Sequence, residues 1–284
     1  MTGVPDYIII GAMKCGTTTL ARQLGGQAGL FMTDPKEPNY FSDDAVFARG
    51  PDWYADLFAT AAPGDLRGEA STHYTKLPDY PDTIARLAAT AAENARFVYL
   101  IRDPTVRAVS HYIHEWTTGV IGRNTGFETA VEQHPEILSY GRYGHQIAPW
   151  LERFGPDRIH VDTLEAMTED PQALLDRVGA FLGRTGLVWD AGEGQANASA
   201  ERLRQTSLDR WLLQGRAVTW LRRTLVPQSV RDRVKAGRRL PARPTIPDDV
   251  RARMEAVFLE DRAVLHGLFP DRPDLDRAYP FASP

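Results

Sequence analysis

Apolar and polar positions divide this chain into short apolar runs and longer amphipathic stretches. The clearest apolar runs are residues 6–11 (DYIIIG) and 95–101 (ARFVYLI), in which nearly every position is apolar. A run of this kind is typical of a parallel strand that is buried on both faces. Shorter runs predict further strands at residues 30–32, 66–70 and 158–161.

Helical segments lie between these strands. We expect helices at residues 17–24, 53–59, 81–92, 104–116, 127–134, 146–154 and 171–182. Gly25 and Gly26 end the first of them, and Pro104 suits the first turn of the fourth. Because strands alternate with helices, we predict an α/β fold with a central parallel sheet between two layers of helices. The 284 residues can form one large domain of this kind.

The loop between the first strand and the first helix has the sequence GAMKCGTTT, residues 11–19. Gly11 and Gly16 have the spacing of the nucleoside-triphosphate P-loop, G-x-x-x-x-G-K-S/T, but Thr17 stands where the lysine belongs. The lysine is Lys14, inside the loop. Backbone N–H groups at a helix start bind anions, and Lys14 and the hydroxyls of residues 17–19 would add to this cradle. The alternative is a tight turn with an exposed lysine.

A second candidate site lies where the apolar run 95–101 ends. Arg102 follows that strand directly, and Ser110 lies two helical turns further on, with Arg107 and His111 nearby. Ligands of open α/β sheets bind at the carboxyl ends of the strands. Arg102 and Ser110 could therefore hold a second phosphate, although Arg102 with Asp103 could also be an ion pair that caps a helix. Together, the two sites indicate a ligand with two separated anionic groups.

These motifs resemble those of the sulfotransferases that use 3′-phosphoadenosine 5′-phosphosulfate (PAPS), a family with a P-loop-like three-layer α/β/α fold. The resemblance is closest to the branch that holds the heparan sulfate glucosaminyl N- and O-sulfotransferases. Three further segments are similar to that branch: PKEPNYF at residues 35–41, EASTHY at 69–74 and AGRRLP at 236–241. The resemblance implies that the 5′-phosphosulfate is bound by Lys14, Cys15, Gly16, Thr17, Thr18 and Thr19. It also implies that Arg102 and Ser110 bind the 3′-phosphate, and that the cofactor is covered by Ala236, Gly237, Arg238 and Arg239.

By the same resemblance, Glu37 is the general base, and Lys14 stabilises charge on the departing phosphate oxygen. The alternative for Glu37 is a surface carboxylate paired with Lys36. The cytosolic branch of the family uses a histidine base, so His73, His111 and His114 are rivals. Of these we expect His114 to be a packing or surface residue. We expect Cys15 to be a small buried residue in the loop.

The acceptor is less well defined by the sequence. Candidates for contact with it are Lys36, His73, Tyr74 and Tyr143, together with Tyr140, Arg142 and His145. Ala70 stands where the glycan enzymes have a lysine, Asn39 replaces a histidine, and Ala236 replaces another lysine. We therefore expect a hydroxyl of a small molecule or glycoside as the acceptor, and a heparin-like polyanion need not be the substrate. A P-loop kinase or NTPase and a non-catalytic nucleotide-binding protein remain the alternatives.

Composition excludes several other classes of protein. The net charge of −4 provides no general attraction to nucleic acid, and the single cysteine excludes an internal disulfide and a Cys-based zinc site. No His, Asp and Glu cluster has the spacing of metal ligands, and no metal is expected. There is neither a signal-peptide pattern nor an apolar run near the roughly 18–20 residues of a membrane span, which favours a cytoplasmic protein. The abundance of Ala, Arg, Asp and Gly is compatible with a bacterial protein.

Residues 201–243 differ from the rest in charge. They contain 12 basic and 3 acidic residues, with tryptophans and leucines at near-helical spacing. Amphipathic helices with solvated basic faces explain this pattern. The alternative is a segment that covers an anionic cofactor or acceptor.

Overall fold

The computed structural model describes residues 4–192 and 243–282, and its centre is a five-stranded sheet. All strand pairings are parallel, and the strand order is β2-β3-β1-β4-β5. The strands are β1 (Tyr7–Gly11), β2 (Leu30–Met32), β3 (Leu66–Ala70), β4 (Arg96–Ile101) and β5 (Ile159–Thr163). All of β1 is buried, as its apolar sequence predicts for a central strand.

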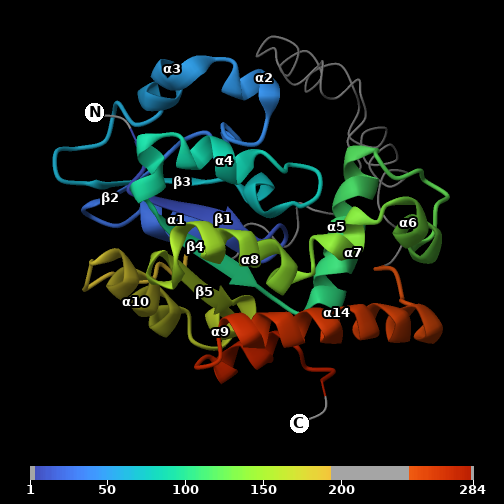
Figure 1. Cartoon of the computed structure of the whole chain (residues 1–284). Coiled ribbons are helices and arrows are strands. Elements are labelled where there is room, and N and C mark those ends of the chain that lie inside the picture. Colours follow the sequence, from blue (N-terminus) through green and yellow to red (C-terminus); the bar gives the residue numbers. More distant parts are fainter. Residues whose placement is uncertain (1–3, 193–242, 283–284) are drawn as a thin grey trace, which may run out of the picture.

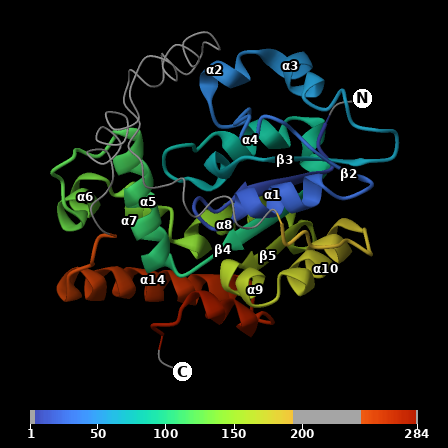
Figure 2. The same cartoon turned by 180° about the vertical axis from the view of Figure 1, so that it is seen from behind.

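Helices cover both faces of this sheet (Figures 1 and 2). Helices α4 (Thr83–Ala88) and α8 (Tyr143–Phe154) lie on one face, and α1 (Thr17–Gly25) and α10 (Pro171–Leu182) lie on the other. The predicted three-layer α/β/α architecture with a parallel sheet is therefore confirmed.

The remaining helices lie around different edges of the sheet (Figure 1). They are α2 (Asp44–Phe47), α3 (Gly50–Asp56), α5 (Pro104–Thr118), α6 (Phe127–Gln133), α7 (Glu136–Ser139), α9 (Leu164–Glu169) and α14 (Asp248–Leu268). A second apolar core joins α5, α6, α7 and α14. Within the residues described, no helix is both long and apolar enough to cross a membrane.

Helix α14 was missed by the sequence analysis, although its buried residues Val250, Met254, Phe258 and Leu265 have helical spacing. It packs against α8 and α5. The buried carboxylate of Asp261 accepts the backbone N–H groups of Gly144 and His145, at 2.8 and 2.9 Å. This contact caps the N-terminus of α8 and explains why that helix begins at Tyr143, earlier than the predicted residue 146.

Other boundaries also differ from the prediction. The helix predicted at 81–92 is shorter and is followed by a 3-10 turn at Ala91–Asn94, while the strand predicted at 158–161 is Ile159–Thr163. The helix predicted at 53–59 is Gly50–Asp56. The basic segment 201–243, with Ala236, Gly237, Arg238 and Arg239, lies outside the described residues apart from Arg243.

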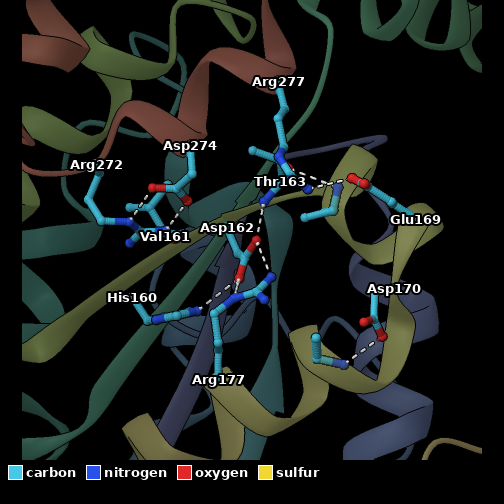
Figure 3. A network of polar contacts seen from close by, with 12 residues as sticks. His160, Val161, Asp162, Thr163, Glu169, Asp170, Arg177, Arg272, Asp274 and Arg277 are labelled. Carbon is cyan, nitrogen blue, oxygen red and sulfur yellow. Dashed lines mark hydrogen bonds and ion pairs between the residues drawn. The ribbon is translucent and has the colours of Figure 1, made fainter.

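A polar network joins the edge strand β5 to α9, α10 and the C-terminal segment (Figure 3). Asp162 is buried and accepts two hydrogen bonds from Arg177, at 2.8 and 3.1 Å. Arg272 donates to the carbonyl of Val161 at 2.9 Å and pairs with Asp274, and Arg277 pairs with Glu169. These contacts hold the 3-10 turn Pro273–Ala278 beside the sheet.

Candidate active site

A cleft of about 590 Å³ lies at the carboxyl ends of the sheet strands. It brings together residues from segments far apart in the sequence. The predicted site residues that line it are Lys14, Gly16, Thr17, Thr18, Thr19, Glu37, His73, Arg102 and Ser110. Parallel strands place their carboxyl ends on one edge, which explains how residues after four different strands meet here.

Gly16 forms the turn between the loop and α1. Its φ of 89° is in the left-handed region, and a Cβ there would lie 2.6 Å from Cε of Met167 and 2.8 Å from Cδ1 of Leu164. Only glycine fits both the backbone angle and the space. Gly16 supplies no capping side chain to α1, and Thr17, Thr18 and Thr19 of its first turn line the cleft, an arrangement that suits an anion.

Arg102 connects the end of β4 to the loop. Its Nη1 donates to the carbonyl oxygen of Lys14 at 3.0 Å, while its buried Nε has no hydrogen-bond partner in the part of the chain described. Asp103 instead caps α5, because its Oδ1 accepts the N–H groups of Thr105 and Val106 at 2.8 and 3.1 Å. Arg102 therefore forms no ion pair with Asp103, and its Nε is a donor without an acceptor among the described residues, beside the loop of residues 11–19.

Glu37 reaches the cleft from the loop that follows β2. The carboxylate Oε1 accepts Lys36 Nζ at 2.6 Å and Thr72 Oγ1 at 3.2 Å. Although burial favours the neutral acid, the cations of Lys36 and Lys76 hold the pKa of Glu37 below its ordinary value. Glu37 is thus both paired with Lys36, as the alternative interpretation expected, and part of the cleft, with an ionised carboxylate at neutral pH.

The backbone around Glu37 is held by β3 and the turn after it. The N–H of Glu37 donates to the carbonyl of Ala70 at 2.9 Å, and the N–H of Asn39 donates to Ser71 Oγ at 3.1 Å. Ser71 in turn donates to the buried carboxylate of Glu69 at 2.8 Å. Ala70 and Asn39, which depart from the glycan-enzyme pattern, therefore contribute through their backbones to the placement of Glu37.

Comparison with known proteins identifies the family. A sulfotransferase domain model matches residues 4–208 of the chain. The chain belongs to the sulfotransferase family. The bifunctional heparan sulfate N-deacetylase/N-sulfotransferase 3 of Mus musculus is 26% identical over 199 residues, which are 63% of this chain and 22% of that protein. The membrane-associated sulfotransferase kil1 of Dictyostelium discoideum is 30% identical over 154 residues, 50% of this chain and 31% of that protein.

The chain thus spans between a fifth and a third of the length of these two curated relatives. A solved sulfotransferase from Alicyclobacillus acidocaldarius shares the fold, with a TM-score of 0.64 and 22% identity, covering 93% of this chain and 95% of that one. The family is therefore the one that the motifs indicated, and heparan sulfate N-sulfotransferases are among the relatives of the chain.

The fold separates the three histidines that are rivals to Glu37. His114 lines the cleft, whereas His111 is 1% exposed and does not. His111 packs its ring on Tyr140 at 5.4 Å and lies 3.5 Å from the carboxylate of Glu115. Of the two, His111 is thus the buried packing residue, because α5 packs there against α7, while His114 lies toward the cleft.

His73 also lines the cleft. Its ring stacks on Tyr80 at 4.7 Å, and its buried Nδ1 has no hydrogen-bond partner among the described residues. Burial, together with the charge of Lys76, lowers the pKa of His73 to about 4, so this imidazole is neutral at pH 7. His73 remains a rival base to Glu37.

Several predicted residues lie behind the cleft rather than along it. Cys15 is fully buried, its Sγ lies 3.6 Å from the hydroxyl of Tyr143, and burial raises the pKa of its thiol to about 11. Tyr143 is itself fully buried. Tyr74 is also buried and donates to Glu69 at 2.9 Å. The side chains of Cys15, Tyr143 and Tyr74 support the site from the core. Tyr140 at the end of α7, and Arg142 and the exposed His145 at the start of α8, do not line the cleft either.

Lys76, which the sequence patterns did not indicate, lines the cleft together with Glu37 and His73. Thr72, whose hydroxyl donates to Glu37, was not predicted as a site residue either. A lysine just after the EASTHY segment has no sequence signature that distinguishes it from a solvated residue. The glycan enzymes have a lysine where this chain has Ala70, whereas this chain has Lys76 in the cleft.

Proposed function

We propose that this chain transfers a sulfuryl group from PAPS to a hydroxyl of a small-molecule or glycoside acceptor. The observation that supports this most strongly is the shared cleft, which combines an uncapped helix N-terminus, Lys14 and Arg102 with the carboxylate of Glu37. The first three features suit a ligand with phosphate groups, and the carboxylate suits removal of a proton from a nucleophile.

The donor fits the residues present. The N–H groups at the start of α1, Lys14 and the hydroxyls of Thr17, Thr18 and Thr19 would hold the 5′-phosphosulfate. The Nε of Arg102, which has no hydrogen-bond acceptor among the described residues, and the hydroxyl of Ser110 would hold the 3′-phosphate. PAPS supplies a sulfuryl group on a good leaving group, and the protein needs mainly to position the reactants and stabilise charge.

In the proposed reaction, Glu37 takes the proton of the acceptor hydroxyl as the acceptor oxygen forms its bond to sulfur. The bond between sulfur and the bridging oxygen of the phosphosulfate breaks, and that oxygen keeps the electron pair. Lys14 and the N-terminus of α1 then stabilise the new charge on the phosphate. Thr72 and Lys36 hold the Glu37 carboxylate in place, at 3.2 and 2.6 Å.

Calorimetry and a transfer assay would test this proposal. We expect 3′,5′-phosphoadenosine (PAP) to bind without magnesium, and radiolabelled PAPS to transfer label to a hydroxyl acceptor. Magnesium-dependent ATP binding without PAP binding would instead identify a kinase or NTPase. PAP binding without transfer to any member of a broad acceptor panel would identify a nucleotide-binding protein.

A further inference from the structure

Lys76 lines the cleft but is not one of the residues that would bind the donor. It follows the 3-10 turn Thr72–Thr75 after β3, and its side chain is only 7% exposed although it lines the cleft. Within residues 4–192 and 243–282, its ammonium makes no hydrogen bond and no ion pair shorter than 4.0 Å. Lys76 is therefore a nearly buried cation that faces the cleft, with no carboxylate within 4.0 Å among the described residues.

Aromatic and polar neighbours hold the Lys76 side chain in this place. Its Nζ lies 5.5 Å from the ring centre of Tyr140. The hydroxyl of Tyr140 donates to Asp79 at 2.5 Å, and its ring stacks on His111. The orientation of Lys76 is thus supported by groups from α5, from the segment before α8 and from the chain after Lys76 itself.

A buried ammonium without an anion is unfavourable in an unliganded protein. Burial lowers the pKa of Lys76 to about 8, against the opposing effect of Glu37 and Glu115. An oxyanion that entered the cleft would restore the interactions lost by burial and would favour the protonated lysine. The local structure is therefore better suited to the liganded state.

The strand order separates Lys76 from the donor groups. Lys14 follows β1 and Arg102 follows β4, which are adjacent strands. Glu37 follows β2, and Lys76 follows β3 and its turn, which form the neighbouring half of the sheet. Lys76 consequently shares its side of the cleft with the proposed base rather than with the phosphate loop.

We infer that Lys76 binds an oxyanion carried by the acceptor, such as a carboxylate, phosphate or sulfate, beside the hydroxyl that faces Glu37. This inference rests on the proposed function, because it takes Glu37 to mark the acceptor side. It makes Lys76 a specificity residue: the preferred acceptor is an acidic small molecule or acidic glycoside rather than a neutral one.

Calorimetry with the full chain saturated with PAP provides the first test, with inorganic sulfate as the probe. PAP occupies the phosphate sites, so sulfate reports on the rest of the cleft. We expect Lys76→Met to weaken sulfate binding about 10-fold or more, the loss of one charged contact, while the affinity for PAP stays unchanged. Lys76→Arg should retain binding. Arg22→Met, which removes an exposed cation at the far end of α1, is the matched control and should behave like the unaltered protein.

Transfer to paired acceptors, such as a hexose and the corresponding uronic acid, provides the second test. Lys76→Met should raise KM for the acidic acceptor about 10-fold without changing its kcat. For the neutral acceptor, KM and kcat should both stay nearly unchanged. Equal effects on both members, or unchanged sulfate binding, would overturn the inference. Weaker binding of PAPS with unchanged binding of PAP would also overturn it, since Lys76 would then contact the sulfuryl group of the donor. If the unaltered protein failed to bind PAP, the proposed function itself would fail.

Discussion

Replacement of Asp162 by asparagine tests how strongly the polar network on β5 stabilises the fold. The Asp162 carboxylate is 1% exposed and accepts hydrogen bonds from Arg177 and from the N–H of Thr163, and His160 lies 3.4 Å away. Although burial opposes its ionisation, these hydrogen bonds lower the pKa of Asp162 from 3.8 to about 2. The folded protein therefore favours the ionised carboxylate more than the unfolded chain does.

The pKa difference sets the size of the effect. A difference of nearly two pH units corresponds to about 2 kcal/mol of folding free energy. Because the folded pKa is the lower one, this stabilisation is fully present above about pH 4 and is lost as the pH falls toward 2. Asp162→Asn should accordingly lower the free energy of unfolding by about 2 kcal/mol at pH 7 and by progressively less below pH 4.

Urea unfolding followed by tryptophan fluorescence at pH 7, 4 and 3 measures this difference. The matched control is Asp44→Asn, which breaks the contact with Arg86 at a carboxylate that is 88% exposed. A surface pair of this kind contributes about 0–1 kcal/mol. If Asp162→Asn destabilised no more than Asp44→Asn, or if its effect did not shrink in acid, the reasoning about this buried carboxylate would be refuted.

Three further predictions concern the cleft. Glu37→Gln should leave PAP affinity unchanged and reduce kcat by about 10²–10⁴-fold in the transfer assay, and full activity would exclude it as the base. Arg102→Ala should weaken PAP binding in calorimetry by about 10- to 100-fold, since one charge-assisted contact is lost; an unchanged Kd would remove Arg102 from the donor site. Gly16→Ala should weaken PAP binding and lower Tm together, because a Cβ would lie 2.6 Å from Met167 at a residue with φ of 89°; normal values for both would show that the loop tolerates a side chain.

The strands and the loop of residues 11–19 could be predicted because their sequence signals are local. A strand buried on both faces needs an uninterrupted apolar run, which residues 95–101 supply, and the loop needs glycines at particular positions between a strand and a helix. Helix α14 could have been predicted as well, since Val250, Met254 and Phe258 recur every four residues. Helix ends were less accurate, because contacts such as that of Asp261 with the start of α8 come from distant segments.

The sequence by itself determined the α/β class, the glycine-flanked loop that contains Lys14, and the family to which the chain belongs. Tertiary structure alone decided which titratable groups meet. Two histidines one helical turn apart were separated into a buried residue, His111, and a cleft residue, His114, by the packing of neighbouring helices. Lys76 became a cleft residue because the turn after β3 and the ring of Tyr140 direct it there. The physical reason is that backbone patterns depend on near neighbours, whereas burial and charge pairing depend on segments that only folding brings together.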